Sequence, residues 1–231
     1  MHSFTRRLLS ATYKALLRTA IYIPFTTSNI LYRSLDRSAQ TVLDIGCGRG
    51  VPAHLVLRRC SHYYLVGLDI FEPYVRECQK SGSHEALILG DARRLPFSKS
   101  KPFDIVFLVE VIEHLDKQEA QQVLEAAEEI CRKQIILTAP VGFLRQQAYD
   151  SNLYQEHKSA WNPAEFKRMG YKVRGVGIRR VWGRAEEGGC SFIPAAYRPL
   201  LVSLVQVLAG PLVYFLPAIA GGMIAVKRIG G

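Results

Sequence analysis

Residues 43–50 read LDIGCGRG, and this stretch places three glycines directly after a short apolar run. The apolar run, 41–46, is typical of a buried strand. Gly46, Gly48 and Gly50 can adopt positive φ angles and let a ligand approach the backbone closely. A helix that begins immediately afterwards presents free N–H groups to such a ligand. The stretch therefore predicts a strand, a turn and a helix, with a ligand site at the turn.

The rest of the chain alternates apolar runs with helical patterns. Further strands are expected at 63–69, 85–91, 103–109, 134–140, 171–181 and 221–228, and helices at 51–60, 71–82, 116–133 and 162–170. In the helix expected at 116–133, Asp116 and Glu119 have the spacing of a capping box. Arg132 and Lys133 suit the negative end of the same helix. Strands separated by helices of this length predict an α/β fold, with a mostly parallel sheet covered by helices on both faces.

Two acidic residues stand at the ends of the next two expected strands. Asp69 lies 19 residues after Gly50, and Asp91 ends the third strand. Parallel strands end at a common edge of the sheet, where ligands bind, and a carboxylate at the Asp69 position can bind both hydroxyls of a ribose. A dinucleotide-dependent dehydrogenase fits less well, because GCGRG lacks the GxGxxG spacing: Gly50 follows Gly48 after one residue, and Pro52 comes soon after.

These residues resemble class I S-adenosylmethionine-dependent methyltransferases. DIGCGRG resembles the first motif of that family, and LVGLDI, LILGDARRLPF, FDIVFLVEVIEHL and IILTAP follow at similar spacing, over about residues 40–182. The resemblance implies S-adenosyl-L-methionine as cofactor and a Rossmann-like sheet of seven strands, the last antiparallel between the fifth and sixth. The cofactor site that it implies consists of Asp44, Gly46, Cys47, Gly48, Gly50, Asp69, Ile70, Asp91, Ala92 and Glu110.

The resemblance also implies roles within this site. Gly46 and Gly48 would line the methionine end of the cofactor, and Asp69 would bind its ribose. Asp91 and Ala92 would hold the adenine. The cofactor already carries an activated methyl group, so positioning contributes much of the rate.

The sequence EVIEH follows the fourth expected strand, beside the expected methyl group. Glu110, Glu113 and His114 can converge on one cation if this turn is helical. The motif is similar to that of metal-dependent quinone O-methyltransferases and of small-RNA 2′-O-methyltransferases, where a later histidine adds a ligand; His157 matches it here. Metal-free relatives also carry EH followed by Leu. We therefore expect no metal, with these four residues as the alternative ligand set, and we expect His157, Glu113 and His114 to form the catalytic group.

The formal net charge of +10 favours anionic partners such as phospholipid, nucleic acid or an acidic substrate. Residues 1–38 begin with a basic segment in which apolar residues recur at helical spacing, as in a helix that lies on a membrane or packs on the domain. The five cysteines form no CxxC pair, which argues against a disulfide framework or a structural zinc site. A cytoplasmic protein, peripheral on the inner face of the membrane, is expected.

An uncharged stretch runs from 199 to 226. Gly210–Pro211 and Pro217 interrupt it, and its last residues belong to the expected seventh strand, so each remaining part is too short to cross a bilayer. We expect an apolar helical hairpin within 191–220, at the same edge of the sheet as the ligand site. Such a hairpin needs a partner. A membrane leaflet, contacted through 1–22 and 199–220, is the first expectation, and a homodimer contact or a lid over an apolar substrate are alternatives.

The expected enzyme thus has an N-terminal segment, 1–38, and a methyltransferase domain, 39–231. It would transfer methyl groups from S-adenosylmethionine to a hydrophobic or membrane-associated small molecule or lipid. An RNA or other nucleic-acid methyltransferase is an alternative that the charge allows, but no basic strip interleaved with aromatic residues supports nucleic acid as a partner. A non-catalytic cofactor-binding scaffold is the other alternative.

Overall fold

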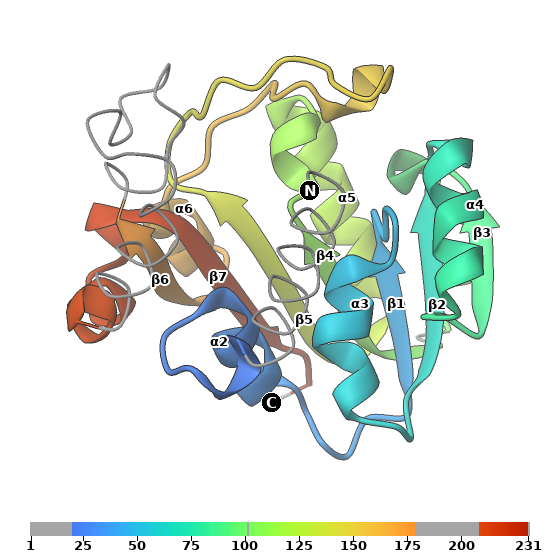
Figure 1. Cartoon of the computed structure of the whole chain (residues 1–231), viewed down its shortest axis with the longest axis horizontal. Helices are drawn as coiled ribbons and strands as arrows, with labels where there is room; N and C mark the ends of the chain where they lie inside the picture. The colour runs from blue at the N-terminus through green and yellow to red at the C-terminus, as the bar shows by residue number, and fades with distance from the viewer. Residues whose placement is uncertain (1–19, 101, 179–207, 231) are drawn as a thin grey trace, which may run out of the picture.

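The computed structural model describes residues 20–100, 102–178 and 208–230 (Figure 1). Seven strands of this part of the chain form one sheet in the order β3-β2-β1-β4-β5-β7-β6, in which β7 is antiparallel to both of its neighbours. The arrangement confirms the predicted seven-stranded sheet and the position of its antiparallel strand. The strands are β1 Thr41–Ile45, β2 Tyr64–Asp69, β3 Ala86–Leu89, β4 Phe103–Val109, β5 Cys131–Pro140, β6 Lys172–Ile178 and β7 Ala220–Arg228.

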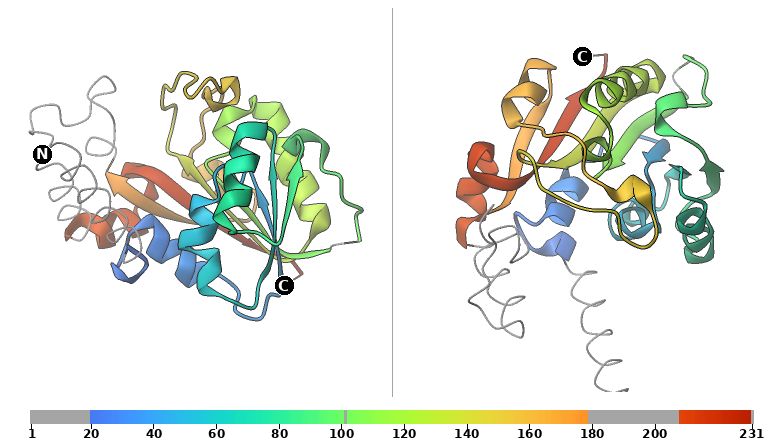
Figure 2. Two further views of the ribbon diagram at one scale, coloured as in Figure 1. Left: turned by 45° about the vertical axis from the view of Figure 1, so that its right-hand side comes forward. Right: turned by 90° about the horizontal axis from the view of Figure 1, so that it is seen from above.

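Helices cover both faces of the sheet, as Figure 2 shows. They are α2 Thr27–Ser34, α3 Val51–Leu55, α4 Glu72–Ser81, α5 Lys117–Ile130 and α6 Pro163–Arg168. Successive residues of β1 point to opposite faces, as the pleat of a strand requires. Leu43 packs in the core that contains Val123 of α5 and Phe166 of α6. Val42 packs in the other core, with Ile30 of α2 and with α3.

Two expected helices are shorter than the sequence predicted. The capping box of Asp116 and Glu119 is present, but α5 ends at Ile130. Arg132 and Lys133 therefore lie at the start of β5 and not at a helix end, which corrects the prediction. The chain has already joined the sheet at this point, because Cys131 pairs with Phe103 of β4. Arg132 Nε lies 3.2 Å from an Asp104 carboxylate oxygen. The helix expected at 51–60 is divided into α3 and a 3₁₀ turn, Leu57–Arg59.

The described part of the β6–β7 connection is helical over 208–215 and continues in a 3₁₀ turn, Pro217–Ile219. The first half of the predicted hairpin and residues 1–19 lie outside the described residues. The 208–215 helix packs closely on β6, since a Cβ at Gly175 would collide with the backbone carbonyl of Val213. Among the residues that the structure describes, no helix combines the length and the apolar character needed to cross a membrane.

Candidate active site

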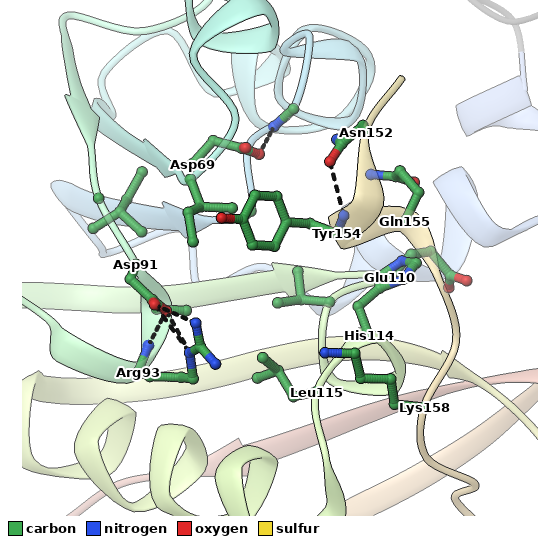
Figure 3. Close-up of a pocket in the computed structure, with 17 residues that line it drawn as sticks. Asp69, Asp91, Arg93, Glu110, His114, Leu115, Asn152, Tyr154, Gln155 and Lys158 are labelled. Atoms are coloured by element: carbon green, nitrogen blue, oxygen red, sulfur yellow. Dashed lines mark hydrogen bonds and ion pairs between the residues drawn. The ribbon is translucent and has the colours of Figure 1, made fainter. Parts of the chain in front are cut away.

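A pocket lies at the carboxyl ends of β1, β2, β3 and β4 (Figure 3), with about 760 Å³ of space that includes its open mouth. Its other wall is the segment 141–161, which leaves β5 and which we call the strap. Seven of the ten residues predicted to bind the cofactor line this pocket: Gly46, Gly48, Asp69, Ile70, Asp91, Ala92 and Glu110. The strap contributes Asn152, Tyr154, Gln155 and Lys158. The predicted strand-end residues are therefore brought together, while Asp44, Cys47 and Gly50 lie outside the lining.

The glycine-rich turn has left-handed backbone at all three glycines, with φ of 69° at Gly46, 53° at Gly48 and 78° at Gly50. Gly46 and Gly48 present their backbone to the pocket. Gly50 has a different function in the fold, because a Cβ there would lie 2.9 Å from the Cys78 sulfur and 3.1 Å from the Ser81 hydroxyl of α4. The third glycine thus permits close packing of the turn on α4.

Asp69 at the end of β2 fixes the glycine-rich turn. One carboxylate oxygen accepts a hydrogen bond from the Gly48 backbone N–H at 2.8 Å, and the other accepts from the Phe71 N–H at 2.8 Å. Burial raises the pKa of this carboxyl above its ordinary value, and the backbone hydrogen bonds oppose that shift. Each carboxylate oxygen can accept a further hydrogen bond. Asp69 therefore has acceptor capacity left for hydroxyl groups of a ligand in the pocket.

Asp91 at the end of β3 is held by a residue that the sequence analysis missed. Arg93 donates its backbone N–H to the Asp91 carboxylate at 2.9 Å and its guanidinium at 2.6–3.0 Å. The same guanidinium donates to Glu119 of α5 at 2.8 Å. These hydrogen bonds from Arg93 lower the pKa of Asp91, so it remains a carboxylate. Arg93 also lines the pocket, where it fixes the orientation of the acid.

Asp44 lies beneath the turn and is 2% exposed. One of its carboxylate oxygens lies 3.1 Å from Nε2 of His84. Burial lowers the pKa of His84, but hydrogen bonds to Asp44 and Cys78 outweigh burial and raise it to about 9. The buried, hydrogen-bonded pair of Asp44 and His84 therefore supports the turn from below. His84 has no motif that could have indicated it, because its partner is 40 residues away.

Glu110 directly follows β4 and has a φ of 54°, a left-handed conformation that costs a non-glycine residue about 1–2 kcal/mol. Such strain concentrates at functional sites. Thr138 on the neighbouring strand holds the residue in place: its hydroxyl donates to the Glu110 carboxylate at 2.6 Å and accepts from the Glu110 N–H at 3.1 Å. Glu110 is thereby fixed at the pocket wall.

Glu113, His114 and His157 form one cluster, in which each offers a ligand atom within 4.8 Å of the others. His114 lines the pocket, whereas Glu113 and His157 are buried behind it. The two imidazole rings meet edge to face with centroids 4.7 Å apart. His157 reaches this position from the strap, as its predicted role required, although its own ring is not part of the pocket lining.

Backbone carbonyls fix the tautomers of both histidines. Nδ1 of His114 lies 3.2 Å from the Glu156 carbonyl, and Nδ1 of His157 lies 2.6 Å from the Leu144 carbonyl. Because a carbonyl only accepts, each Nδ1 carries a hydrogen, so in the neutral form of either ring the lone pair lies on Nε2. Burial, and then the neighbouring His157, lowers the pKa of His114 to about 4. The pocket therefore contains a neutral imidazole with an available lone pair.

Glu113 is 2% exposed, and neither of its buried carboxyl oxygens has a hydrogen-bond partner within the described structure. Burial and the nearby Glu110 raise its pKa well above the ordinary value. A carboxylate buried in this way is costly unless it is protonated or bound to a cation. The donor set of one carboxylate and two Nε2 lone pairs also fits a divalent transition metal.

The order of the sheet and the position of this pocket define a class I S-adenosylmethionine-dependent methyltransferase fold. A family model described as a methyltransferase domain matches residues 42–134 of this chain. The chain is 31% identical over 94 residues to an uncharacterised methyltransferase of Schizosaccharomyces pombe. That match covers 39% of this chain and 34% of the relative, so the chain spans about a third of the relative's length.

Solved structures share the fold at low sequence identity. A chain in the complex between the Trm112 methyltransferase activator of Haloferax volcanii and a methyltransferase matches with a TM-score of 0.59 and 15% identity, covering 96% of this chain and 94% of that one. The plantazolicin methyltransferase BpumL, solved with S-adenosylhomocysteine, matches with a TM-score of 0.53 and 18% identity. That match covers 98% of this chain and 91% of BpumL. A methyltransferase from Archaeoglobus fulgidus matches with a TM-score of 0.51 and 20% identity. That match covers 96% of this chain and 94% of the other.

Proposed function

We propose that this protein transfers a methyl group from S-adenosylmethionine to a hydrophobic or membrane-associated small molecule or lipid. The observation that carries the proposal is a single pocket in which the glycine-rich turn and two strand-end carboxylates face a neutral histidine. The glycine-rich turn and the two carboxylates suit an adenosyl cofactor. The neutral histidine suits an acceptor that must lose a proton.

In this proposal the pocket residues bind the cofactor as the sequence predicted. Gly46 and Gly48 approach its methionine end, Asp69 accepts from the ribose hydroxyls, and Asp91 with Ala92 borders the adenine. When bound, S-adenosylmethionine supplies an activated methyl group for an in-line displacement. The chain contributes orientation and the exclusion of water, which the strap provides on one side of the pocket.

The acceptor side is proposed to be the Glu113–His114–His157 cluster. The Nε2 lone pair of His114 can take the proton that leaves an acceptor hydroxyl or amine. His157 packs edge to face on His114 and restricts its rotation. Glu113 supports the same turn, since its backbone carbonyl accepts from the N–H groups of Lys158 at 2.8 Å and Ser159 at 3.1 Å in the strap. His157 and Glu113 thus act as positioning residues for His114.

A hydrophobic acceptor is supported by exposed apolar residues on the described part of the β6–β7 connection. They are 48–72% exposed and comprise Leu208, Leu212, Phe215, Leu216 and Ile219. Their spacing in and after the 208–215 helix places most of them on one side. The segment joins the carboxyl end of β6 to the start of β7, so it lies at the edge of the sheet that holds the pocket. Insertion of this surface into one leaflet would bring the pocket to a membrane-bound acceptor.

The acceptor can be identified with labelled cofactor. Purified protein is incubated with membranes and with soluble extract in the presence of methyl-labelled S-adenosylmethionine, and we expect label in the lipid-extractable fraction. The double substitution Leu212→Glu and Phe215→Glu should lower labelling of intact membranes about tenfold, because it removes two inserted side chains. Labelling of the same acceptor dissolved in detergent should change less than twofold.

The matched control is Tyr64→Glu, which places a charge on a residue 51% exposed at the start of β2, the opposite edge of the sheet. It should leave membrane labelling unchanged. Label found in RNA, with none in lipid extracts, would overturn the proposed acceptor class. Equal loss in the double variant and in Tyr64→Glu would show that the apolar surface has no specific role.

The unpartnered Glu113 carboxyl group favours a second role for the cluster, as a divalent-cation site. Equilibrium dialysis with Mn²⁺ decides between the two roles. If the cluster holds a cation, the protein should bind one Mn²⁺ per chain, and Glu113→Gln should weaken that binding at least tenfold. Binding of less than 0.1 Mn²⁺ per chain, with turnover unaffected by a chelator, would reject the cation site. His114 would then act as a base without a metal.

A further inference from the structure

The strap is a closed loop whose two halves are joined to each other. The Gly142 N–H donates to the Trp161 carbonyl at 2.6 Å at its base, and the Gln146 side chain donates to the Gln155 carbonyl at 2.8 Å nearer its tip. These bonds join the two halves of the strap to each other. Figure 1 shows it passing over the carboxyl edge of the sheet between β5 and α6.

The tip of the strap is a strained two-residue turn. Tyr149 and Asn152 form an antiparallel bridge, and the two residues between them, Asp150 and Ser151, have φ angles of 55° and 57°. Positive φ at both central positions is the pattern of a type I′ turn, for which Asn-Gly and Asp-Gly are preferred. Here serine occupies the position that prefers glycine, so the turn carries strain that Ser151 itself introduces.

The tip is held down by two residues on the other side of the pocket. The Asp150 carboxylate accepts from the Arg49 guanidinium at 2.8 Å and from the Tyr74 hydroxyl at 3.0 Å. Arg49 also stacks over the Tyr74 ring, with its guanidinium carbon 4.4 Å from the ring centroid. We call Arg49, Tyr74 and Asp150 the clasp. Because the ion pair is about 43% exposed on each side, it is weak and opens easily.

The clasp joins the two walls of the pocket. Arg49 stands between Gly48 and Gly50 in the glycine-rich turn, and Tyr74 lies on α4. Immediately after the tip, Asn152 is buried and accepts from the Tyr154 N–H at 3.0 Å. Figure 3 shows the Tyr154 side chain extending from the strap across the pocket towards Asp69. Release of the tip would therefore free the part of the wall around Tyr154, while Lys158 and Ser159 stay bound to the Glu113 carbonyl.

We propose that the clasp is a releasable closure that controls exchange of the cofactor. The weak ion pair and the hydrogen bond from the Tyr74 hydroxyl favour the closed strap, whereas the strained turn favours the open one. The closed and open forms are therefore close in free energy. The inference rests on the proposed function only in taking the pocket as the cofactor site. Asp150, Tyr74 and Ser151 set how long the strap remains closed, and none of them lines the pocket.

The test measures the rate at which labelled S-adenosylmethionine leaves the protein after a chase with excess unlabelled cofactor. Asp150→Asn and Tyr74→Phe each remove one bond of the clasp, and each should raise the dissociation rate about three- to tenfold. Ser151→Gly keeps the clasp and relieves the turn, so it should lower the rate about threefold. The effect of Asp150→Asn should shrink at high ionic strength, because its ion pair is exposed.

The matched control is Glu77→Gln. Glu77 is the other carboxylate that pairs with Arg49, at 2.8 Å, but it belongs to α4 and has no contact with the strap among the bonds of the described structure. The substitution changes the same charge and should leave the dissociation rate within twofold. Rates that are equal in Asp150→Asn, Glu77→Gln and the unmodified protein, or a faster rate in Ser151→Gly, would overturn the clasp.

A measurement without cofactor separates this inference from the proposed function. Trypsin can cleave after Arg145, an exposed residue of the strap. If the clasp holds the strap closed, cleavage there should be faster in Asp150→Asn than in Glu77→Gln. Faster cleavage in a protein that fails to bind S-adenosylmethionine would reject the proposed function and keep the closure. Equal cleavage in a protein that binds the cofactor would reject the closure alone.

Discussion

Replacement of Asp69 by alanine should weaken binding of S-adenosylmethionine about 100-fold or more. The substitution removes the acceptor for the Gly48 N–H, which fixes the glycine-rich turn, and the proposed acceptor for two ribose hydroxyls. A hydrogen bond to a charged group contributes about 1.5–3 kcal/mol, so the loss of two such bonds is sufficient for an effect of this size. Isothermal titration calorimetry measures the change directly.

Two further variants make the Asp69 result specific. Asp69→Asn keeps one carbonyl oxygen and should lose less affinity than Asp69→Ala. Glu125→Ala removes an exposed acid on the outer face of α5 and should leave the affinity unchanged. Circular dichroism and the melting temperature show whether each variant is folded. A folded Asp69→Ala protein with unaltered affinity would mean that this pocket does not bind the ribose as proposed.

The sheet and the residues at its strand ends could be predicted because both follow from local pattern. Short apolar runs separated by helical segments indicate parallel strands, and parallel strands end at a common edge. Gly46, Asp69 and Asp91 were therefore expected together, although each lies at or just after the end of a different strand. The end of α5 was not predictable in the same way. Two basic residues suit a helix end and an exposed strand start equally, and the pairing of Cys131 with Phe103 of β4 places them in the strand.

The missed residues have partners that are distant in the sequence. Asp150 lies 101 residues from Arg49, and it has no motif that indicates a turn over the pocket. His84 supports Asp44 from 40 residues away. Arg93 is close to Asp91 in the sequence, but its role depends on Glu119 of α5. Contacts of this kind depend on how whole elements pack, and the pattern within a single segment carries no signal for them.

His114 and His157 provide the second test with a large expected effect. His114→Asn should lower kcat about 100-fold, because it removes the one imidazole that lines the pocket, and a positioned base contributes about 10²–10⁴-fold. Asparagine can still donate to the Glu156 carbonyl in place of Nδ1, so the turn should remain intact. Affinity for S-adenosylmethionine should change less than threefold, which separates a defect in chemistry from one in cofactor binding.

The double variant tests whether the two histidines act together. His157→Asn retains a donor for the Leu144 carbonyl and removes the ring that packs on His114, so it should also lower kcat, by about 10–100-fold. If His157 acts only through His114, the double variant should be no slower than His114→Asn, since groups that act as a unit are non-additive. The exposed His62, changed to Asn, is the control and should keep full activity. Effects that multiply in the double variant would instead give His157 an independent role in the reaction, because the loss of its ring would then matter even when His114 is absent.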